Sequence, residues 1–551
     1  MSAIITPKFR IFNAKKFIAS LANDELVNAG SFVTGTTYTI TTTGDTDFTV
    51  IGAANSDPDT VFTATGVGTG TGTATYATEK LYVGIGKPDV WATGDAAETV
   101  DTALSYSRIA YQSMTDMKKI NTTDISHVMT RRDFDAAAVD FVPWNSNSAT
   151  AFDDKFYCIT TAGKVYKCVG KQNTATTPTE PIHTTTSPEL SSGHWWQYMF
   201  TTEGDENTNF QTTVFSPVQT ATAASTRLTH QNACATVSVT AGSFVNSTTY
   251  TIATAGTTDF TLIGAADSNP GTVFTASGAG TGTGTANSGG ANTGIYHYEV
   301  VNGGTGYTAS VSLTCTVTGD GFGAAATLQT NSSGVITGYT ITTAGTGYTY
   351  AAIEGISGGG SGAVIRPSVA PGLGHGTDPV EELGGHYVVA HAELAGSAAT
   401  VNNDFRQLSL ILNPIEDDGN TLANAASYRP MRRLTVTAAE ADDFVVDQII
   451  TEATSGAQGR VVDIDVGNGY IYYVQSDDYS SSDVAITTGT GFTPFTGGEA
   501  LTSSSGSAAS STITGSPIKT GSGDIIFLEN LSAPVERATN QTEDIKIVIE
   551  F

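Results

Sequence analysis

The sequence predicts a mainly β protein: a discontinuous β-sandwich core with a few peripheral helices, interrupted by several small inserted all-β modules. Only 14% of the 551 residues are charged, against roughly 25% in an ordinary globular protein, and Gly supplies 60 residues. Short runs that alternate polar and apolar residues end at Gly or Asp-Pro turns, which is typical of short strands. Finally, two segments of 45 residues are nearly identical to each other.

This duplication is the strongest internal signal. Residues 30–74 and 242–286 agree at about 34 of 45 positions without a gap, at a constant offset of 212. Each copy alternates around TYTI, DFTVIGA and TVFTA, so we expect three short strands per copy. The GTGTGTA tail of each copy is expected to be either a flexible rim or a close-packed edge. Inserted modules are therefore predicted at 28–77 (copy 1) and 236–290 (copy 2).

Two further duplications predict two more inserts. The sequence GTGYT occurs at 304–308 and again at 345–349, which predicts an all-β module over 293–370. A looser repeat around Gly456 and Gly506 predicts a module of two similar halves over 445–515.

The remainder is expected to form one discontinuous core that holds all four Trp residues. Its pieces are 1–27, 78–235, 371–444 and 516–551. Apolar residues at helical spacing predict a helix from Val100 to Met117. Residues 81–86 are predicted to form a strand, 156–168 a hairpin, and 544–551 a terminal strand that alternates strongly.

The charge balance limits the classes of partner. A formal charge of −28 argues against nucleic-acid binding, which needs clustered Lys and Arg, and against binding to anionic membranes. There is no apolar run long enough to span a bilayer, and the N-terminus lacks the apolar core of a cleaved signal. Four Cys residues do not make a disulfide framework. We therefore expect synthesis in a reducing cytoplasm, with Cys158 and Cys168 as reduced, packed thiols rather than a disulfide.

No pattern in the sequence predicts catalysis, a metal site or a cofactor. The eight His residues are scattered, and no motif places a nucleophile beside a base. Adjacent acidic residues are expected in solvated loops, because adjacency does not place two carboxylates across a cleft. These pairs are Glu381-Glu382, Asp417-Asp418, Asp442-Asp443 and Asp477-Asp478.

Aromatic and arginine residues of the core are the candidate interface or core anchors. They are Arg131, Arg132, Trp144, Trp195, Trp196, Tyr198, Phe405 and Arg406. The alternation in HWWQYMF (194–200) predicts a strand with Trp196, Tyr198 and Phe200 on one buried face; stacking on sugars or bases is the alternative. The Arg131-Arg132-Asp133 run fits either an interface ion-pair cluster or a helix end.

Eight short pieces of the core occur in an order that is fairly specific as a set, although none is diagnostic alone. They are TPKFR (6–10), LYVGIGKPDVW (81–91), the 98–118 segment, RRDF (131–134), VYKC (165–168), HWWQYMF (194–200), FRQLSLILNP (405–414) and the tail 523–551. With the inserts set aside, this core resembles the baseplate wedge subunit of T-even-type contractile-tailed bacteriophages that family members build as a dimer.

The resemblance implies a virion structural protein, located in the tail baseplate, without catalytic residues or cofactors. It implies a homodimer that joins other baseplate wedge proteins around the tail tube and takes part in the rearrangement that triggers sheath contraction. Tail-fibre attachment is left open. The inserts depart from the family pattern, and a tail fibre or adhesin subunit that binds host-surface glycans through them is the alternative.

Overall fold

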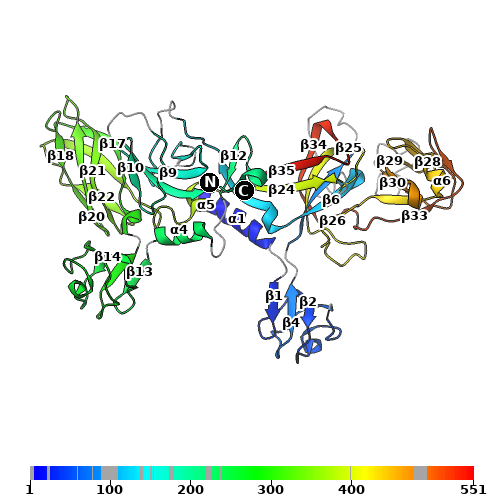
Figure 1. Ribbon diagram of the computed structural model, residues 1–551, viewed down its shortest axis with the longest axis horizontal. Helices are drawn as coiled ribbons and strands as arrows, with labels where there is room; N and C mark the ends of the chain where they lie inside the picture. Colours follow the sequence, from blue (N-terminus) through cyan, green and yellow to red (C-terminus); the bar gives the residue numbers. More distant parts are fainter. Residues whose placement is uncertain are drawn as a thin grey trace. The chain divides into compact units, whose positions relative to one another are not determined.

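The computed structural model shows a mainly β protein, as the composition predicts (Figure 1). The described residues are 5–21, 25–58, 60–76, 79–88, 110–135, 141–148, 152, 154–172, 179–218, 225–235, 237–288, 290–396, 399–475 and 493–551. The chain divides into two compact units. Unit 1 is Met1–Ala14, Ser126–Val389 and Ile549–Phe551, and unit 2 is Lys15–Ile125 and Ala390–Val548. No helix in the described ranges has the length and apolar character needed to span a membrane.

A five-stranded antiparallel sheet lies at the centre of unit 2. Its order is β26 (Ser427–Tyr428), β6 (Met114–Ile120), β5 (Leu81–Gly86), β25 (Asn403–Leu412) and β34 (Asp524–Arg537). All six residues of β5 are buried, and the strand predicted at 81–86 is confirmed. Strand β25 pairs with β5 on one side and with β34 on the other. The sheet therefore unites segments that lie hundreds of residues apart.

The helix predicted over Val100–Met117 is wrong in its C-terminal part. Residues 110–113 are helical, but Met114 begins strand β6 and Met117 lies within it; residues 100–109 lie outside the described ranges. The first four residues of β6 are all buried. A strand covered on both faces does not alternate, so its apolar residues can mimic helical spacing.

The two near-identical segments fold as two copies of one small sheet. Copy 1 has the order β1 (Glu25–Asn28), β4 (Thr73–Tyr76), β2 (Thr37–Thr42) and β3 (Val61–Thr63). Copy 2 has β13 (Val237–Thr240), β16 (Thr285–Ser288), β14 (Thr249–Thr254) and β15 (Val273–Thr275). The buried cluster of each copy consists of residues of that copy, packed around Phe48 in one and Phe260 in the other.

The DFTVIGA segment does not form the strand that its alternation predicts. It forms a single 3-10 turn, η1 (Phe48–Ile51) in copy 1 and η3 (Phe260–Ile263) in copy 2. The Asp47 side chain accepts a hydrogen bond from the Thr49 backbone N–H, and Gly52 ends the turn at φ +107°. Phe48 and Ile51 are both buried, because residues three apart lie on one face of a helical turn.

The GTGTGTA tails are close-packed edges rather than flexible rims. A Cβ atom added to Gly72 would lie 2.8 Å from Cε2 of Phe48. In copy 2, a Cβ added to Gly284 would lie 2.7 Å from the same atom of Phe260. The absence of a side chain thus lets the tail cover an aromatic ring of the core.

A seven-stranded sheet forms around the 445–515 segment of unit 2. Its order is β32 (Ser507–Ala508), β31 (Leu501–Thr502), β28 (Ile449–Glu452), β29 (Gln458–Asp465), β30 (Tyr470–Val474), β27 (Arg432–Thr435) and β33 (Thr512–Thr514). Each of the two similar halves forms a hairpin, and β28 pairs with β31 between them. Leu434 and Phe444 belong to the same buried cluster, so this body starts before residue 445. Helix α6 (Ala438–Ala441) and the turn η6 (Val466–Asn468) complete it.

A four-stranded sheet carries the tryptophan-rich segment of unit 1. Its order is β10 (Glu189–Ser191), β11 (His194–Thr201), β9 (Lys164–Lys171) and β8 (Tyr157–Ile159). The pairing of β8 with β9 confirms the predicted hairpin. The helices α3 (Gly204–Phe210) and α4 (Thr226–Cys234) follow, and β12 (Phe215–Pro217) pairs with β7 (Ile125–Thr130).

The 293–370 segment of unit 1 folds from three sets of antiparallel strands. They are β17 (His297–Thr305) with β23 (Ser361–Ser368), β18 (Ser312–Thr314) with β20 (Phe322–Thr330) and β21 (Ile336–Thr346), and β19 (Thr316–Gly319) with β22 (Ala351–Glu354). Its buried cluster also contains Val169 of β9, and Trp195 packs against it. Unlike the two copies, this segment shares its apolar interior with the tryptophan-bearing sheet.

Three kinds of element remain: helices, single turns and two strands. They are α1 (Pro7–Ser20), η2 (Thr122–Asp124), η4 (Gly290–Thr293), α5 (Pro379–Glu382), β24 (Tyr387–Ala395) and β35 (Thr542–Glu550). Strand β35 covers most of residues 544–551, so the predicted terminal strand is confirmed.

The separate cores of the two copies predict separate responses to core mutation. Phe260→Ala should destabilise copy 2 by about 3–5 kcal/mol, because it leaves a cavity in a small core. Hydrogen exchange should then rise across 242–286 and remain unchanged across 30–74. The matched substitution Phe48→Ala should reverse the pattern. Increased exchange in both copies after either substitution would contradict independent cores.

Candidate functional site

The candidate site is built around Lys167, a charged residue in the middle of strand β9. Its side chain is fully buried, at 0% exposure. Because side chains alternate along a strand, Lys167 shares a face with Val165 and Val169, opposite Tyr166 and Cys168. An ammonium group removed from water requires an anionic partner. The strand therefore needs a carboxylate on this face.

Glu382 supplies that carboxylate, from the end of the short helix α5. Lys167 Nζ lies 2.7 Å from Glu382 Oε2, and the glutamate side chain is 2% exposed. The other oxygen, Oε1, accepts hydrogen bonds from the backbone N–H groups of Gly376 (2.8 Å), Thr377 (3.0 Å) and Asp378 (3.3 Å). Both oxygens of the buried carboxylate are thus satisfied, which is the condition for a stable buried ion pair.

Local sequence chemistry places Glu382 at this point. Asp378 caps α5, because its Oδ1 accepts a hydrogen bond from the Glu381 N–H at 3.0 Å, and Pro379 occupies the first helical turn. Gly376 has φ +89°, and a Cβ added there would lie 3.0 Å from Cys234 Sγ. The loop before α5 therefore packs directly against helix α4, with room only for glycine.

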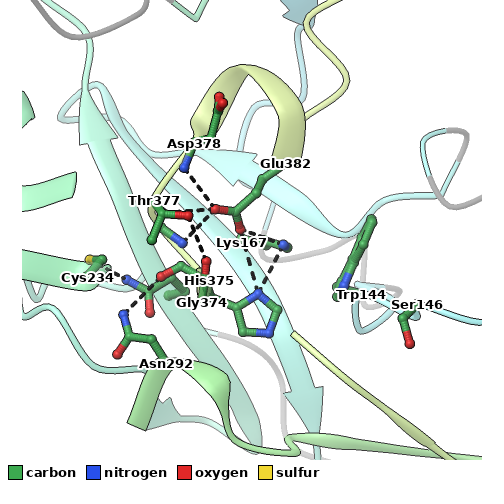
Figure 2. Close-up of polar contacts among 12 residues, drawn as sticks. Trp144, Ser146, Lys167, Cys234, Asn292, Gly374, His375, Thr377, Asp378 and Glu382 are labelled. Carbon is green, nitrogen blue, oxygen red and sulfur yellow. Dashed lines mark hydrogen bonds and ion pairs between the residues drawn. The ribbon is translucent and has the colours of Figure 1, made fainter. Parts of the chain in front are cut away.

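His375 is the third member of the cluster and joins it to another segment. Its Nδ1 lies 3.1 Å from Lys167 Nζ and 3.7 Å from Glu382 Oε2. Its backbone N–H donates to the carbonyl of Asn292 at 2.9 Å, and the Asn292 side-chain amide donates back to the His375 carbonyl at 2.9 Å. Figure 2 shows the three side chains converging, with Asn292 on the far side of His375.

Trp144 completes the surroundings of the lysine. Lys167 Nζ lies 4.3 Å from the centroid of the Trp144 ring, a distance at which the ring quadrupole attracts an ammonium group. The Trp144 backbone N–H donates to the Cys168 carbonyl at 2.8 Å. Trp144 is thus a core anchor that covers the buried cation beside the ion pair (Figure 2).

The pKa values of the cluster describe a fixed ion pair beside a neutral imidazole. Burial lowers the pKa of Lys167, although Glu382 opposes this. Burial would raise the pKa of Glu382, but the Lys167 ammonium and the His375 side chain together outweigh burial, and the pKa falls to about 2. Burial and then the Lys167 charge lower the pKa of His375 to about 4. At neutral pH the neutral imidazole accepts a hydrogen bond from the ammonium through Nδ1.

The arrangement joins three segments of unit 1 at a site buried from solvent. They are the centre of β9, the loop that leads into α5, and the turn η4. Removing one charge leaves the other buried without its partner, which is far more costly than losing an exposed pair. The cluster is therefore a polar joint that fixes the relative position of these segments.

Sequence reasoning missed this cluster, and the solvated loop expected for Glu381-Glu382 is wrong for Glu382. Glu381 is exposed, as expected, whereas Glu382 is 3% exposed. The usable signal was Lys167 itself, a lysine in the interior of β9 that alternation places on the same face as Val165 and Val169. Of the other pairs, Asp417-Asp418 and Asp442-Asp443 are exposed, as expected, and Asp477-Asp478 lies outside the described residues.

The expected alternation of Trp196, Tyr198 and Phe200 on one face is wrong. Register shifts interrupt the pairing of β11 with β9 between Trp195 and Trp196 and again between Tyr198 and Phe200. Trp196 and Tyr198 pack with Cys158, Tyr166 and Cys168, while Phe200 joins a different cluster with Met199. An irregularity that adds a residue to one strand moves every later side chain to the other face.

The other candidate anchors divide into buried and surface residues. Trp195 is half-buried beside Tyr296, with ring centroids 5.3 Å apart. Phe405 is 3% exposed, and Arg406 is half-exposed at the register shift that follows it. Arg131 pairs with Asp133 after the end of β7, with Nε 2.9 Å from Oδ1, so the run is not a helix end. The Arg132 guanidinium lies over the Tyr157 ring at 5.3 Å.

The cysteines and the acidic residues form no further site within the described ranges. Cys158 and Cys168 are both buried free thiols, and burial raises the pKa of Cys168 to about 12. No group of three or more His, Cys, Asp or Glu side chains among the described residues could hold a metal ion.

No protein-family model matches the chain, and a search of curated proteins finds no significant match.

Breaking the buried pair should destabilise unit 1 strongly. Lys167→Met leaves a buried carboxylate without its cation, and Glu382→Gln leaves a buried ammonium without its anion, so each should cost about 3–5 kcal/mol. Denaturant unfolding followed by tryptophan fluorescence measures this loss. Glu381→Gln, the exposed neighbour, is the matched control and should change stability by less than about 0.5 kcal/mol. A double variant that loses as much as the two single variants together would contradict the pairing.

Acidification should weaken unit 1 in two steps. In the folded state the pKa of His375 is about 4, against about 6.5 unfolded, and that of Glu382 is about 2, against about 4.3 unfolded. The unfolded chain therefore binds protons first, and stability falls as pH drops. The His375 contribution disappears between about pH 6.5 and 4, and that of Glu382 between about pH 4.3 and 2. His375→Asn should flatten the upper step, measured by unfolding at each pH.

Proposed function

We propose that the protein is a structural component of a phage tail baseplate wedge. In this role it assembles with other wedge proteins around the tail tube and takes part in the rearrangement that triggers sheath contraction. The observation that carries the proposal is the collinear set of core pieces, from the N-terminal TPKFR to the C-terminal tail, that resembles the wedge subunit.

The fold of unit 2 supports this assignment. The LYVGIG piece forms β5, the FRQLSLILNP piece forms much of β25, and part of the tail forms β34. These three strands are neighbours in one sheet. These three pieces, which were chosen only for their order in the sequence, therefore share one sheet, as expected if insertions interrupt a single domain.

The fold of unit 1 supports it in the same way. VYKC lies in β9 and HWWQYMF lies in β11, and these two strands pair directly. The lysine of the VYKC piece is Lys167, so this piece carries the buried joint described above. An assembly subunit that holds its shape until a large rearrangement needs such internal joints.

The two copies of the inserted module are consistent with decoration of this core. Each closes its own buried cluster, so each can be added without altering the strands that precede and follow it. The proposal includes a homodimer and contacts to other wedge proteins, for which half-exposed Arg131 and Arg406 are candidate contact residues.

Labelling of intact tails tests the proposal. Antibody fragments raised against residues 242–286 should bind at the baseplate end of the parent phage tail in electron micrographs, because the proposal puts the subunit there. As a control for cross-reaction between the two copies, the antibody fragments are first depleted of those that bind a peptide of residues 30–74. Labelling confined to fibre tips or to the capsid would contradict it.

The mass in solution gives a second readout of the same prediction. Light scattering should give twice the 56.9 kDa chain mass, as expected for the homodimer. A stable trimer would instead favour the fibre or adhesin alternative.

A further inference from the structure

A cleft of about 820 Å³ lies within unit 1. Helix α4, copy 2 of the inserted module, and strands β20 and β21 of the 293–370 segment line it. This volume is within the roughly 300–1,000 Å³ range of small-molecule sites. The cleft lies outside the Lys–Glu–His cluster, whose three side chains do not line it.

The copy 2 wall of the cleft is the outer face of its sheet. Thr249 and Thr251 are two residues apart in β14, and Thr251 pairs with Val273 of β15. All three line the cleft, whereas Tyr250 between the two threonines points into the module core. Thr249 and Val273 are exposed on this wall, whereas Thr251 is only 1% exposed. The solvent-facing part of the wall therefore combines the Thr249 hydroxyl with the apolar side chain of Val273.

The opposite wall contributes an aromatic ring. Phe322 of β20 lies opposite Thr346 of β21 in the pairing of these strands, and both line the cleft. The ring also contacts copy 2, because a Cβ added to Gly271 would lie 3.0 Å from Cδ2 of Phe322. Phe322 is half-buried, so part of its surface remains in contact with solvent.

Comparison of the two copies shows what is particular to this wall. Five residues of copy 2 line the cleft: Thr248, Thr249, Thr251, Gly271 and Val273. Four of them have the same residue at the equivalent position of copy 1, and the fifth, Gly271, replaces Asp59. The one difference removes a negative charge and a side chain beside Phe322. Copy 2 is therefore neutral at this position of its sequence, where copy 1 has an aspartate.

We propose that this cleft is a binding site for a neutral oligosaccharide. None of its lining residues is charged, although the chain carries a net charge of −28. Hydroxyl groups of threonine and the amide of Asn232, which also lines the cleft, donate and accept hydrogen bonds as sugar hydroxyls do. The Phe322 ring offers an apolar surface for the C–H face of a pyranose ring.

Other ligand classes fit the lining less well. A phosphorylated or sulfated ligand would find no Lys or Arg to pair with its charge, and a metal ion would find no carboxylate. A purely apolar ligand would bury the threonine hydroxyls without partners, which is unfavourable. The proposal goes beyond the baseplate assignment and stands independently of it, since both a wedge protein and an adhesin can carry such a site.

Titration of the full chain with defined sugars tests the site. The probes are maltohexaose, chitohexaose and mannohexaose as neutral oligosaccharides, with a heparin hexasaccharide as the charged comparison, each followed by ligand-observed NMR. Saturable binding of at least one neutral probe, insensitive to salt, is expected. Failure of all three neutral probes to bind, or binding of the heparin probe alone, would overturn the proposal.

Variants locate the binding in the cleft. Phe322→Ala should weaken binding roughly three- to tenfold, as loss of an aromatic contact does, and Asn232→Ala should weaken it further. Phe322→Leu keeps an apolar side chain against Gly271 and serves where the alanine variant fails to fold. The matched control is Tyr350→Ala, an aromatic residue of the same segment that is 64% exposed and does not line the cleft; its affinity should be unchanged. Equal affinity of the wild-type chain and both Phe322 variants would overturn the assignment.

Discussion

The burial of one charge, that of Lys167, governs much of the organisation of unit 1. A fully buried ammonium in the centre of β9 obliges a carboxylate to reach the same face of the sheet, and Glu382 does so from more than 200 residues further along the chain. That requirement fixes the loop before α5, which in turn holds His375 against Asn292. The turn η4 and the loop before α5, which precede and follow the 293–370 strands, are thus both held at the Lys167–Glu382–His375 cluster. The Trp144 ring covers the Lys167 ammonium.

The inserted copies show the opposite arrangement, because the buried core of each copy consists only of its own residues. Each copy closes a small core around four aromatic rings, and glycines in the tail allow the chain to cover one of those rings. A module of this kind can be inserted into a loop at little cost, because loop-closure entropy grows slowly with length. The 293–370 segment differs, since its interior includes Val169 of the tryptophan-bearing sheet.

The elements that the sequence predicted correctly are those whose pattern is local. Alternation, or an apolar run with a turn beside it, was enough to predict strand β5, the β8–β9 hairpin and the terminal strand β35. The incorrect predictions also have local causes. Strand β6 is buried on both faces, so Met114 and Met117 imitate helical spacing. Irregular pairing in β11 interrupts the alternation that would place Trp196 and Phe200 on the same face of the strand. DFTVIGA alternates like a strand, yet its Asp cap and its Gly favour a single helical turn.

The sequence by itself determined the mainly β class, the duplicated modules and the low-charge character of the chain, because periodicity, turn residues and repeats act over a few positions. The partners of Lys167, the contact of Phe322 with Gly271 and the neutral cleft between modules were decided only by the tertiary structure. Each depends on which distant segments of the chain meet. The role of a buried charge or of a residue that lines a cleft can be inferred only once its neighbours in space are known. The physical reason is that desolvation and packing are properties of three-dimensional surroundings, whereas alternation is a property of the chain.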